Sequence, residues 1–165
     1  MPDKPMAELA PPRAKEVLPR HSVATPVVDT ITLPYEQRHR RRIVLASDSG
    51  IDFLLDLAET TLLKNGDVLV LEDGRAIDIR AAAEPLLEVR GKDAAHLLKL
   101  AWHLGNRHLE AQIDKDRILI RRDHVIADML ERLGAAIREV EVPFNPEGGA
   151  YGGHRHSHGS HHHGQ

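Results

Sequence analysis

The chain has 165 residues, and its 22 basic and 25 acidic side chains give a formal net charge of −3. This length accommodates one ordinary domain or two small ones, and the slightly acidic balance does not indicate a protein that seeks polyanions. The chain contains no cysteine, which excludes disulfides, thiolate metal sites and a cysteine nucleophile. A metal site must therefore use imidazole, carboxylate or backbone ligands, which suit nickel, copper and zinc.

Residues 1–22 contain five of the ten prolines and show no hydrophobic periodicity. The segment is charged and lacks the apolar core of a signal peptide. No apolar run in the chain reaches the length of a membrane span. We therefore expect residues 1–22 to be a flexible extension of a cytoplasmic protein that has no membrane partner.

Residues 23–85 are predicted to form a small all-β domain. Short β-like runs begin at Val27, and the turn Asp48-Ser49-Gly50 separates two of them. Residues 68–80 alternate between apolar and polar side chains around Glu72-Asp73-Gly74, which is typical of a hairpin. The series of short β-like runs stops near Glu84-Pro85, where this domain is expected to end.

Residues 86–148 are predicted to follow the order βαββαβ, which is the ferredoxin-like pattern. Strands are expected at 86–91, 109–113, 117–120 and 135–143. One helix is expected from Lys92 to about Leu104, stopped by Gly105-Asn106, and another from the N-cap Asp123 to Gly134. The predicted inner faces are Ala94, Leu97, Leu98, Ala101 and Leu104 on the first helix, and Val125, Ile126, Met129, Leu130 and Leu133 on the second. The fold class is therefore α+β.

Residues 149–165 are expected to be a disordered histidine-rich tail. The sequence HRHSHGSHHH contains His154, His156, His158, His161, His162 and His163. A purification tag is one interpretation, although arginine, serine and glycine interrupt the run in a way that tags usually do not. The other interpretation is a metal-binding arm, in which His-X-His spacing lets neighbouring imidazoles reach one ion.

Histidines also occur around the first helix of the second domain. His96 and His103 are seven residues apart and share a polar stripe, for which a solvated helix face is the simplest interpretation. His108 follows the helix stop and is expected to begin a strand. Alternation places it with Glu110 and Gln112 on the open face of the sheet, where a ligand or another subunit can approach.

His124 follows the N-cap Asp123 and points away from the apolar stripe of the second helix. For both His108 and His124, the pattern alone leaves open whether the imidazole binds a metal or is simply an exposed side chain.

Other functional classes find less support in the sequence. The basic run Arg38-His39-Arg40-Arg41-Arg42 could contact RNA or an acidic partner, but the acidic overall balance favours a solvent-facing strand. Ferredoxin-like RNA-binding domains stack bases on aromatic residues of the sheet, and the strands expected at 86–91, 109–113 and 117–120 contain none. No phosphate-binding glycine loop or nucleophile–base pair is evident. We therefore predict neither nucleic-acid binding nor enzymatic activity.

The segments WHLGNRHLEAQI, RDHVIADMLERLGA and PFNPEGGAY, together with the histidine-rich end, resemble the UreE family of urease accessory proteins, which act as nickel metallochaperones. The resemblance covers roughly residues 25–165. It implies a β-rich N-terminal domain similar to a chaperone peptide-binding module, followed by a ferredoxin-like metal-binding domain. It also implies a homodimer that forms through the second domain.

The same resemblance implies roles for individual histidines. In the family, each protomer contributes the histidine of the GNRH motif to a central metal site, and this residue is His108. The preceding histidine, in the longer segment WHLGNRH, is His103. A peripheral ligand of some members matches His124, but Arg122 stands where some relatives carry a further histidine. This departure weakens the implication that the chain has a complete peripheral site.

The implied cargo is Ni²⁺, for which Zn²⁺ or Cu²⁺ are expected to compete. The implied partners are the accessory GTPase UreG and the complex of the urease apoprotein with its accessory proteins. A nickel or zinc storage protein without a delivery role remains the alternative, and a pure interaction adaptor is a third class.

Overall fold

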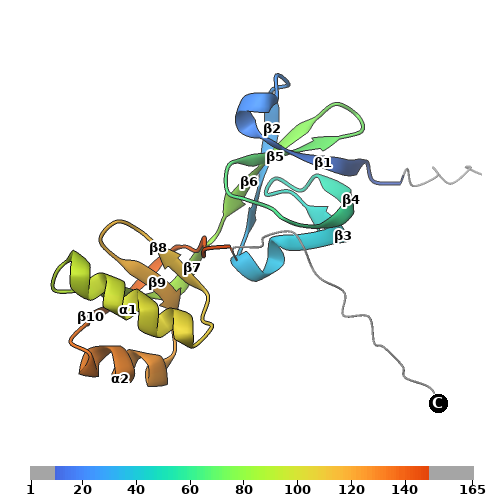
Figure 1. The fold of residues 1–165 in the computed structure, drawn as a ribbon. Helices are drawn as coiled ribbons and strands as arrows, with labels where there is room; N and C mark the ends of the chain where they lie inside the picture. The colour runs from blue at the N-terminus through green and yellow to red at the C-terminus, as the bar shows by residue number, and fades with distance from the viewer. Residues whose placement is uncertain (1–9, 149–165) are drawn as a thin grey trace, which may run out of the picture.

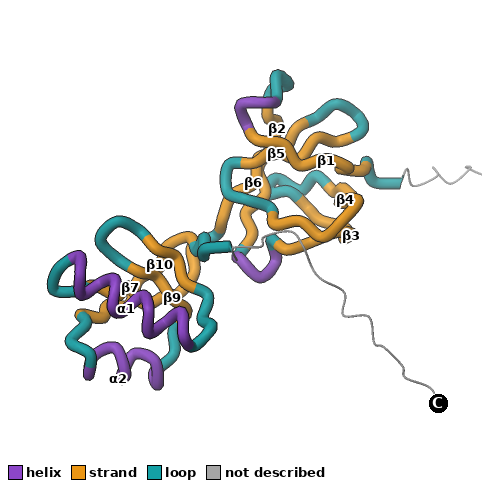
Figure 2. Tube along the Cα trace, viewed as in Figure 1, coloured by secondary structure: helices purple, strands orange, loops and turns teal. Residues whose placement is uncertain are grey.

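The computed structural model describes residues 10–148, which form a sheet-rich N-terminal region and a C-terminal α+β domain (Figure 1). The two parts are separate lobes, and both α-helices of the described residues belong to the C-terminal one, whereas the short helical segments of the other lobe are 3-10 turns (Figure 2). The predicted histidine-rich tail, residues 149–165, lies outside the described residues. No helix within 10–148 has the length and apolar character that crossing a bilayer requires.

The N-terminal region is a six-stranded sheet with the strand order β2-β6-β5-β1-β4-β3. Its elements are β1 (Arg13–Pro19), a 3-10 turn η1 (Arg20–Ser22), β2 (Val27–Leu33), a second 3-10 turn η2 (Tyr35–Gln37), β3 (His39–Ala46), β4 (Asp52–Leu62), β5 (Asp67–Leu71) and β6 (Ala76–Ala81). The predicted hairpin is confirmed, because β5 pairs antiparallel with β6 and Gly74 adopts a φ of +87° in the turn. Its core consists of aliphatic side chains around Phe53.

The prediction of a flexible extension over residues 1–22 is wrong from Arg13 onward. β1 lies in the middle of the sheet, antiparallel to β5 and parallel to β4. Ala14 of this strand is fully buried, and Val17 packs against the core. The prolines at positions 11, 12 and 19 flank or end the strand, so they conceal its alternation without interrupting its pairing.

Side chains join the turn between β3 and β4 to β2, which lies at the opposite edge of the sheet order. The backbone N–H of Asp48 donates to the Thr30 carbonyl at 2.8 Å, and the Asp48 carboxylate accepts from the hydroxyls of Thr30 and Thr32 at 2.7 Å. Hydrogen bonds from Ser47 and Ser49 lower the pKa of Asp29 to about 2. The sheet is thus curled, and hydrogen bonds between hydroxyls and carboxylates join β2 at one edge to the β3–β4 turn at the other.

The C-terminal domain contains β7 (Ala83–Arg90), α1 (Ala94–Asn106), β8 (Ala111–Ile113), β9 (Ile118–Arg121), α2 (His124–Arg132) and β10 (Ala136–Pro143). This is the predicted order βαββαβ. The sheet order is β10-β7-β9-β8, and all neighbouring strands are antiparallel. Both helices cover the same face of the sheet and enclose a core that includes Leu100, Leu104 and Leu130 (Figure 2).

Side-chain caps explain where the two helices begin. The carboxylate of Asp93 accepts from the His96 N–H at 2.7 Å. That of Asp123 accepts from Val125 and Ile126, as predicted for this N-cap. Gly134, with a φ of +87°, follows α2 and lets the chain leave the helix.

Three details of the helix predictions are wrong. α1 continues through Gly105 and ends at Asn106, because the glycine fits within the last helical turn. The buried stripe of α1 runs through Leu97, Leu100 and Leu104, so Leu98 is 73% exposed instead of buried. On α2, Val125 is 62% exposed, because only the Ile126–Leu130 side of this short helix meets the sheet.

The face of the second sheet opposite the helices is partly covered by the N-terminal region. Phe144 follows β10 and is fully buried against Leu86 and Leu119, with Tyr35 packed beside them. The backbone N–H of Tyr35 donates to the Glu84 carboxylate at 2.9 Å. The predicted open face is therefore available only in part, since residues of both lobes meet on it.

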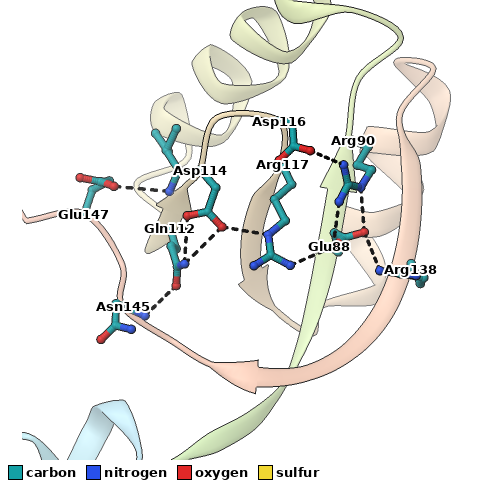
Figure 3. A network of polar contacts seen from close by, with 10 residues as sticks. Glu88, Arg90, Gln112, Asp114, Asp116, Arg117, Arg138, Asn145 and Glu147 are labelled. Carbon is teal, nitrogen blue, oxygen red and sulfur yellow. Dashed lines mark hydrogen bonds and ion pairs between the residues drawn. The ribbon is translucent and has the colours of Figure 1, made fainter. Parts of the chain in front are cut away.

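The rest of this face carries a polar network centred on Glu88 (Figure 3). The Glu88 side chain is 3% exposed and pairs with Arg90, Arg117 and Arg138 at 2.9, 3.0 and 3.1 Å. Hydrogen bonds from Arg90 and Arg117 lower the pKa of Glu88 to about 2, against the opposing effect of burial. Arg117 also pairs with Asp114 at 2.8 Å, which extends the network toward β8.

Candidate metal site

His108 lies in the turn that connects α1 to β8. Its φ is +55°, and it is the single non-glycine residue with a positive φ between residues 10 and 148. Its backbone N–H donates to the Gly105 carbonyl at 3.1 Å, which ties the turn to the end of the helix. Left-handed backbone is disfavoured for residues with a Cβ atom, and such strain collects at functional sites. The turn thus presents an exposed imidazole from a fixed backbone position.

The prediction that His108 begins a strand is wrong. β8 begins three residues later, at Ala111, because α1 is longer than expected and the left-handed turn follows it. The alternation that placed His108, Glu110 and Gln112 on one face does not apply ahead of the strand. Gln112 pairs with Leu119 on the face opposite the helices.

His108 instead lines a groove of about 300 Å³ with residues from β9 and the start of α2. The other lining residues are Leu109, Glu110, Ile120, Arg121, Arg122, Asp123 and Ile126. Two of them are carboxylates. Glu110 pairs with Arg121 at 3.4 Å, and Asp123 caps α2. An ion beside His108 would have room, and each carboxylate uses one oxygen for its present partner, Oε2 of Glu110 and Oδ1 of Asp123.

His103 is near His108 in the chain but does not line that groove. It lies in the last two turns of α1 and is partly buried. Its ring meets the indole of Trp102 edge to face, with the ring centroids 5.1 Å apart. The structure therefore places His103 as a neighbour of the site whose ring environment includes the single tryptophan of the chain.

His124 is the first residue of α2 and is exposed. It lines a different groove, of about 460 Å³, along the outer side of α2 with Val125, Asp128, Met129, Arg132 and Leu133. Arg122 lines the His108 groove and pairs with Glu139 at 3.8 Å. His108 and His124 are thus not brought into one groove.

The six tail histidines, His154, His156, His158, His161, His162 and His163, lie outside the described residues. Between residues 10 and 148, no three side chains of the metal-binding types cluster in a way that could hold an ion. From residues 10–148 of one chain, the candidate site therefore contains one imidazole, that of His108.

His96 departs from the solvated stripe predicted for it. Its Nδ1 accepts from the Lys92 N–H at 2.9 Å, and its Nε2 lies 2.8 Å from the Leu133 carbonyl. The ring thus joins the start of α1 to the end of α2, where helix carbonyls lack partners within the helix. Because both ring nitrogens are engaged, His96 is structural and not a candidate ligand.

Asp123 also lines the His108 groove, a position that was not predicted from the sequence. The capping signal identified Asp123 correctly, but its proximity to His108 arises from the packing of α2 beside the α1–β8 turn. No spacing in the sequence reports that proximity.

Comparison with known proteins places both parts of the chain in one family. The family model described as "UreE urease accessory protein, N-terminal domain" matches residues 14–82, and the one described as "UreE urease accessory protein, C-terminal domain" matches residues 84–165. A protein named urease accessory protein UreE from Chelativorans sp. (strain BNC1) is 63% identical over 136 residues, covering 82% of this chain and 86% of the relative.

Two further relatives carry the same name. The one from Bradyrhizobium sp. (strain ORS 278) is 53% identical over 147 residues, covering 89% of this chain and 70% of the relative. The one from Rhizobium rhizogenes (strain K84 / ATCC BAA-868) is 50% identical over 151 residues, covering 92% and 88%.

Proposed function

The chain belongs to the UreE family of urease accessory proteins, and we propose that it is a metallochaperone that binds Ni²⁺ and delivers it for assembly of the urease metallocentre. Membership of the family implies a role in urease maturation. The relatives are named accessory proteins and not enzymes, which fits the expectation that the chain is not an enzyme. In this proposal nickel is a cargo that the protein receives and releases.

The observation that carries the proposal is the exposed imidazole of His108 on its helix-anchored turn. One imidazole cannot hold an ion tightly, so further ligands must come from elsewhere. In a homodimer, His108 of each protomer would supply two nitrogens. The remaining coordination positions would be open to water, tail histidines or a partner protein. Such an incomplete site can release its ion, whereas a closed four-ligand structural site retains it.

Exposed apolar side chains on α1 support a second copy as the source of the other imidazole. Leu98 is 73% exposed and Trp102 is 66% exposed, one helical turn apart. Trp102 lies six residues before His108, toward the same end of α1. Large exposed apolar side chains that lie together are typical of contact surfaces. We propose that the C-terminal domain is ferredoxin-like and binds the metal, and the exposure of Leu98 and Trp102 supports its role in dimerisation.

The tail histidines fit the same scheme as an auxiliary ligand supply. His154, His156 and His158 alternate with other residues, and three more histidines follow. Ligands tethered to the same chain act at high effective concentration without a fixed geometry. Zn²⁺ and Cu²⁺ are expected to compete at such sites, since imidazole binds both. The proposed partners are the GTPase UreG and the urease apoprotein complex in the cytoplasm, with the N-terminal region serving as a peptide-binding-like module.

A calorimetric titration of Ni²⁺ tests the site. The intact chain should show one tight event per dimer, and His108→Ala should abolish it, because the central nitrogens are lost. His21→Ala is the matched control, since His21 is exposed in η1, far along the chain from the groove. Unchanged tight binding in His108→Ala would remove this residue from the site.

A chain ending at Tyr151 separates the tail from the core. It should bind fewer ions yet keep the tight event, because His108 remains. Loss of all binding on truncation would show that the core site is wrong.

Urease activation at limiting nickel distinguishes delivery from storage. A delivery protein should produce more active urease than the same amount of nickel held by a small-molecule buffer. Equal activation would favour the storage alternative.

A further inference from the structure

β3 lies at one edge of the six-stranded sheet, where β4 pairs with it on one side (Figure 1). In an antiparallel pair, every second residue of an edge strand directs its backbone N–H and C=O groups away from the partner strand. Val44 is such a residue. Leu54 lies opposite it on β4, and the Leu54 N–H donates in the other direction, to the Pro12 carbonyl at 2.9 Å. The backbone groups of Arg42 and Ala46, two residues to either side, therefore also face the open edge.

Within residues 10–148, no second strand pairs with this edge. β2, at the other end of the strand order, bonds to Asp48 in the turn that follows β3 and not to β3 itself. The side chains along the edge are also accessible, since Val44 is 60% exposed and Arg42 and Ala46 are exposed as well. An incoming strand would thus find backbone donors, backbone acceptors and an apolar side chain in one row.

Bonds to buried residues fix both ends of β3. Ahead of the strand, the carbonyl of buried Arg38 accepts from the N–H of buried Leu63 at 2.7 Å. After the strand, the hydroxyl of buried Ser47 donates to the Asp29 carboxylate and accepts from the Ile51 N–H, the latter at 2.8 Å. An edge that is already ordered loses little conformational entropy when a further strand is added to it.

Three consecutive arginines, Arg40, Arg41 and Arg42, lie along this edge strand with little compensation of their charge. Arg41 is exposed, and among residues 10–148 no carboxylate lies within ion-pair distance of it. Arg42 is 62% exposed and reaches Asp56 at 3.9 Å, a carboxylate that Arg13 approaches more closely, at 3.4 Å. The positive charge favours an acidic strand at this edge and opposes pairing with the β3 edge of a second copy.

We propose that the β3 edge binds an extended acidic segment of a partner protein by strand addition. The backbone groups of Arg42, Val44 and Ala46 supply the hydrogen bonds, and Val44 contacts an apolar side chain. The arginines pair with carboxylates at neighbouring positions of the added strand. This inference rests on the part of the proposed function that makes the N-terminal region a peptide-binding-like module, and it names the edge and the chemistry of the bound segment.

The probe is a fluorophore-labelled hexapeptide in which glutamate and valine alternate, and the matched peptide has lysine in place of glutamate. Fluorescence anisotropy measures the binding of each peptide to the full chain. The acidic peptide should bind, and the lysine peptide should bind at least about tenfold more weakly, because like charges repel across a strand pair. Amide hydrogen exchange measured by NMR locates the peptide. The Val44 amide should exchange more slowly in the complex, since its N–H gains an acceptor.

Two substitutions separate charge from backbone pairing. Arg41→Glu should weaken binding of the acidic peptide about tenfold, because an attractive pair becomes repulsive. Arg20→Glu is the matched control, since it makes the same charge change at an exposed residue of η1 and should alter the affinity less than about twofold.

Val44→Pro removes an N–H that faces the open edge and should also weaken binding about tenfold. Val44→Thr keeps the N–H and the branched shape of the side chain, so it should bind nearly as well as the wild type. If Val44→Pro fails to fold, Arg41→Glu decides, because the Arg41 side chain makes no ion pair within residues 10–148.

Equal losses in Arg41→Glu and Arg20→Glu, or equal binding of the two peptides, would overturn the proposal, because overall charge would then explain the result. Absence of binding, or an unchanged exchange rate at Val44 in the complex, would also overturn it. So would sedimentation showing that Val44→Pro separates a dimer, because a second copy would then occupy the edge. The tight Ni²⁺ event is measured on the same samples. Its persistence without peptide binding refutes this inference alone, and peptide binding with normal nickel binding by His108→Ala refutes the nickel site alone.

Discussion

The polar side chain at the centre of the second sheet is buried and paired, whereas the histidine in the turn at the end of α1 is exposed. Glu88 is almost fully buried, and three arginines satisfy its carboxylate. His108 is exposed, its backbone is left-handed, and its imidazole stands in a groove whose carboxylates already have partners. The difference separates charges that hold the fold from a side chain that is kept available for a ligand.

The largest expected effect comes from breaking the first of these regions. Glu88→Gln removes the charge that three partly exposed guanidinium groups share, and loss of hydrogen bonds to a charged group costs about 1.5–3 kcal/mol. The free energy of unfolding, measured by urea denaturation, should fall by that order. Ni²⁺ affinity of the folded protein should stay unchanged, because His108 is not part of the network. A concurrent loss of nickel binding would contradict the separation.

Acid should weaken the same region for a related reason. The pKa of Glu88 is about 2 in the folded protein, below the ordinary value of 4.5, so the unfolded chain binds the proton more readily. The stabilisation is fully present above pH 4.5 and is lost as the pH falls toward 2. This shift corresponds to about 3 kcal/mol. Denaturation curves between pH 5 and 2 should show this decline, and Glu88→Gln should show less of it.

Relief of backbone strain tests the second region. His108→Gly should stabilise the fold by up to about 1 kcal/mol, because glycine adopts a positive φ without a steric cost. The same substitution should abolish tight Ni²⁺ binding. His103→Gly is the control, since glycine within α1 should destabilise by about 1 kcal/mol. Destabilisation by His108→Gly would mean that the imidazole supports the turn.

The smallest expected effect is a change in tryptophan fluorescence. The rings of Trp102 and His103 are 5.1 Å apart, so Ni²⁺ bound by His103 should quench the emission of the single tryptophan. We expect quenching that saturates with the tight event and that His103→Ala diminishes. Emission that does not change during the titration would exclude His103 from the site.

Much of the architecture follows from local patterns. The β5–β6 hairpin, the Asp123 cap and the order βαββαβ all rest on turn chemistry and periodicity within short segments. The GNRH motif identified His108 as the residue to examine, but its surroundings could not be predicted. A left-handed histidine gives no signal in a sequence, and the expected strand alternation therefore misplaced it.

The other errors in the predicted structure concern contacts between residues that are far apart in the sequence. β1 is recognisable only through its partners, which follow about 40 residues or more later. Arg38 and Phe144 are 106 residues apart, and their contact joins two lobes. Read alone, Arg38 belonged to a basic run for which a solvent-facing strand was the favoured interpretation. It is instead buried, because the end of the second domain packs over it.

The central position of β1 has a consequence for how the chain folds during synthesis. Among the strands of residues 10–148, β1 is synthesised before the others, yet its partners β4 and β5 extend to Leu71. Pairing on both sides of β1 must wait until β5 is complete, more than fifty residues after Pro19, since the contacts are non-local. Removal of β1 would also divide the sheet into the halves β2-β6-β5 and β4-β3. β1 thus joins the two halves of a sheet that can be completed only after most of its residues have been synthesised.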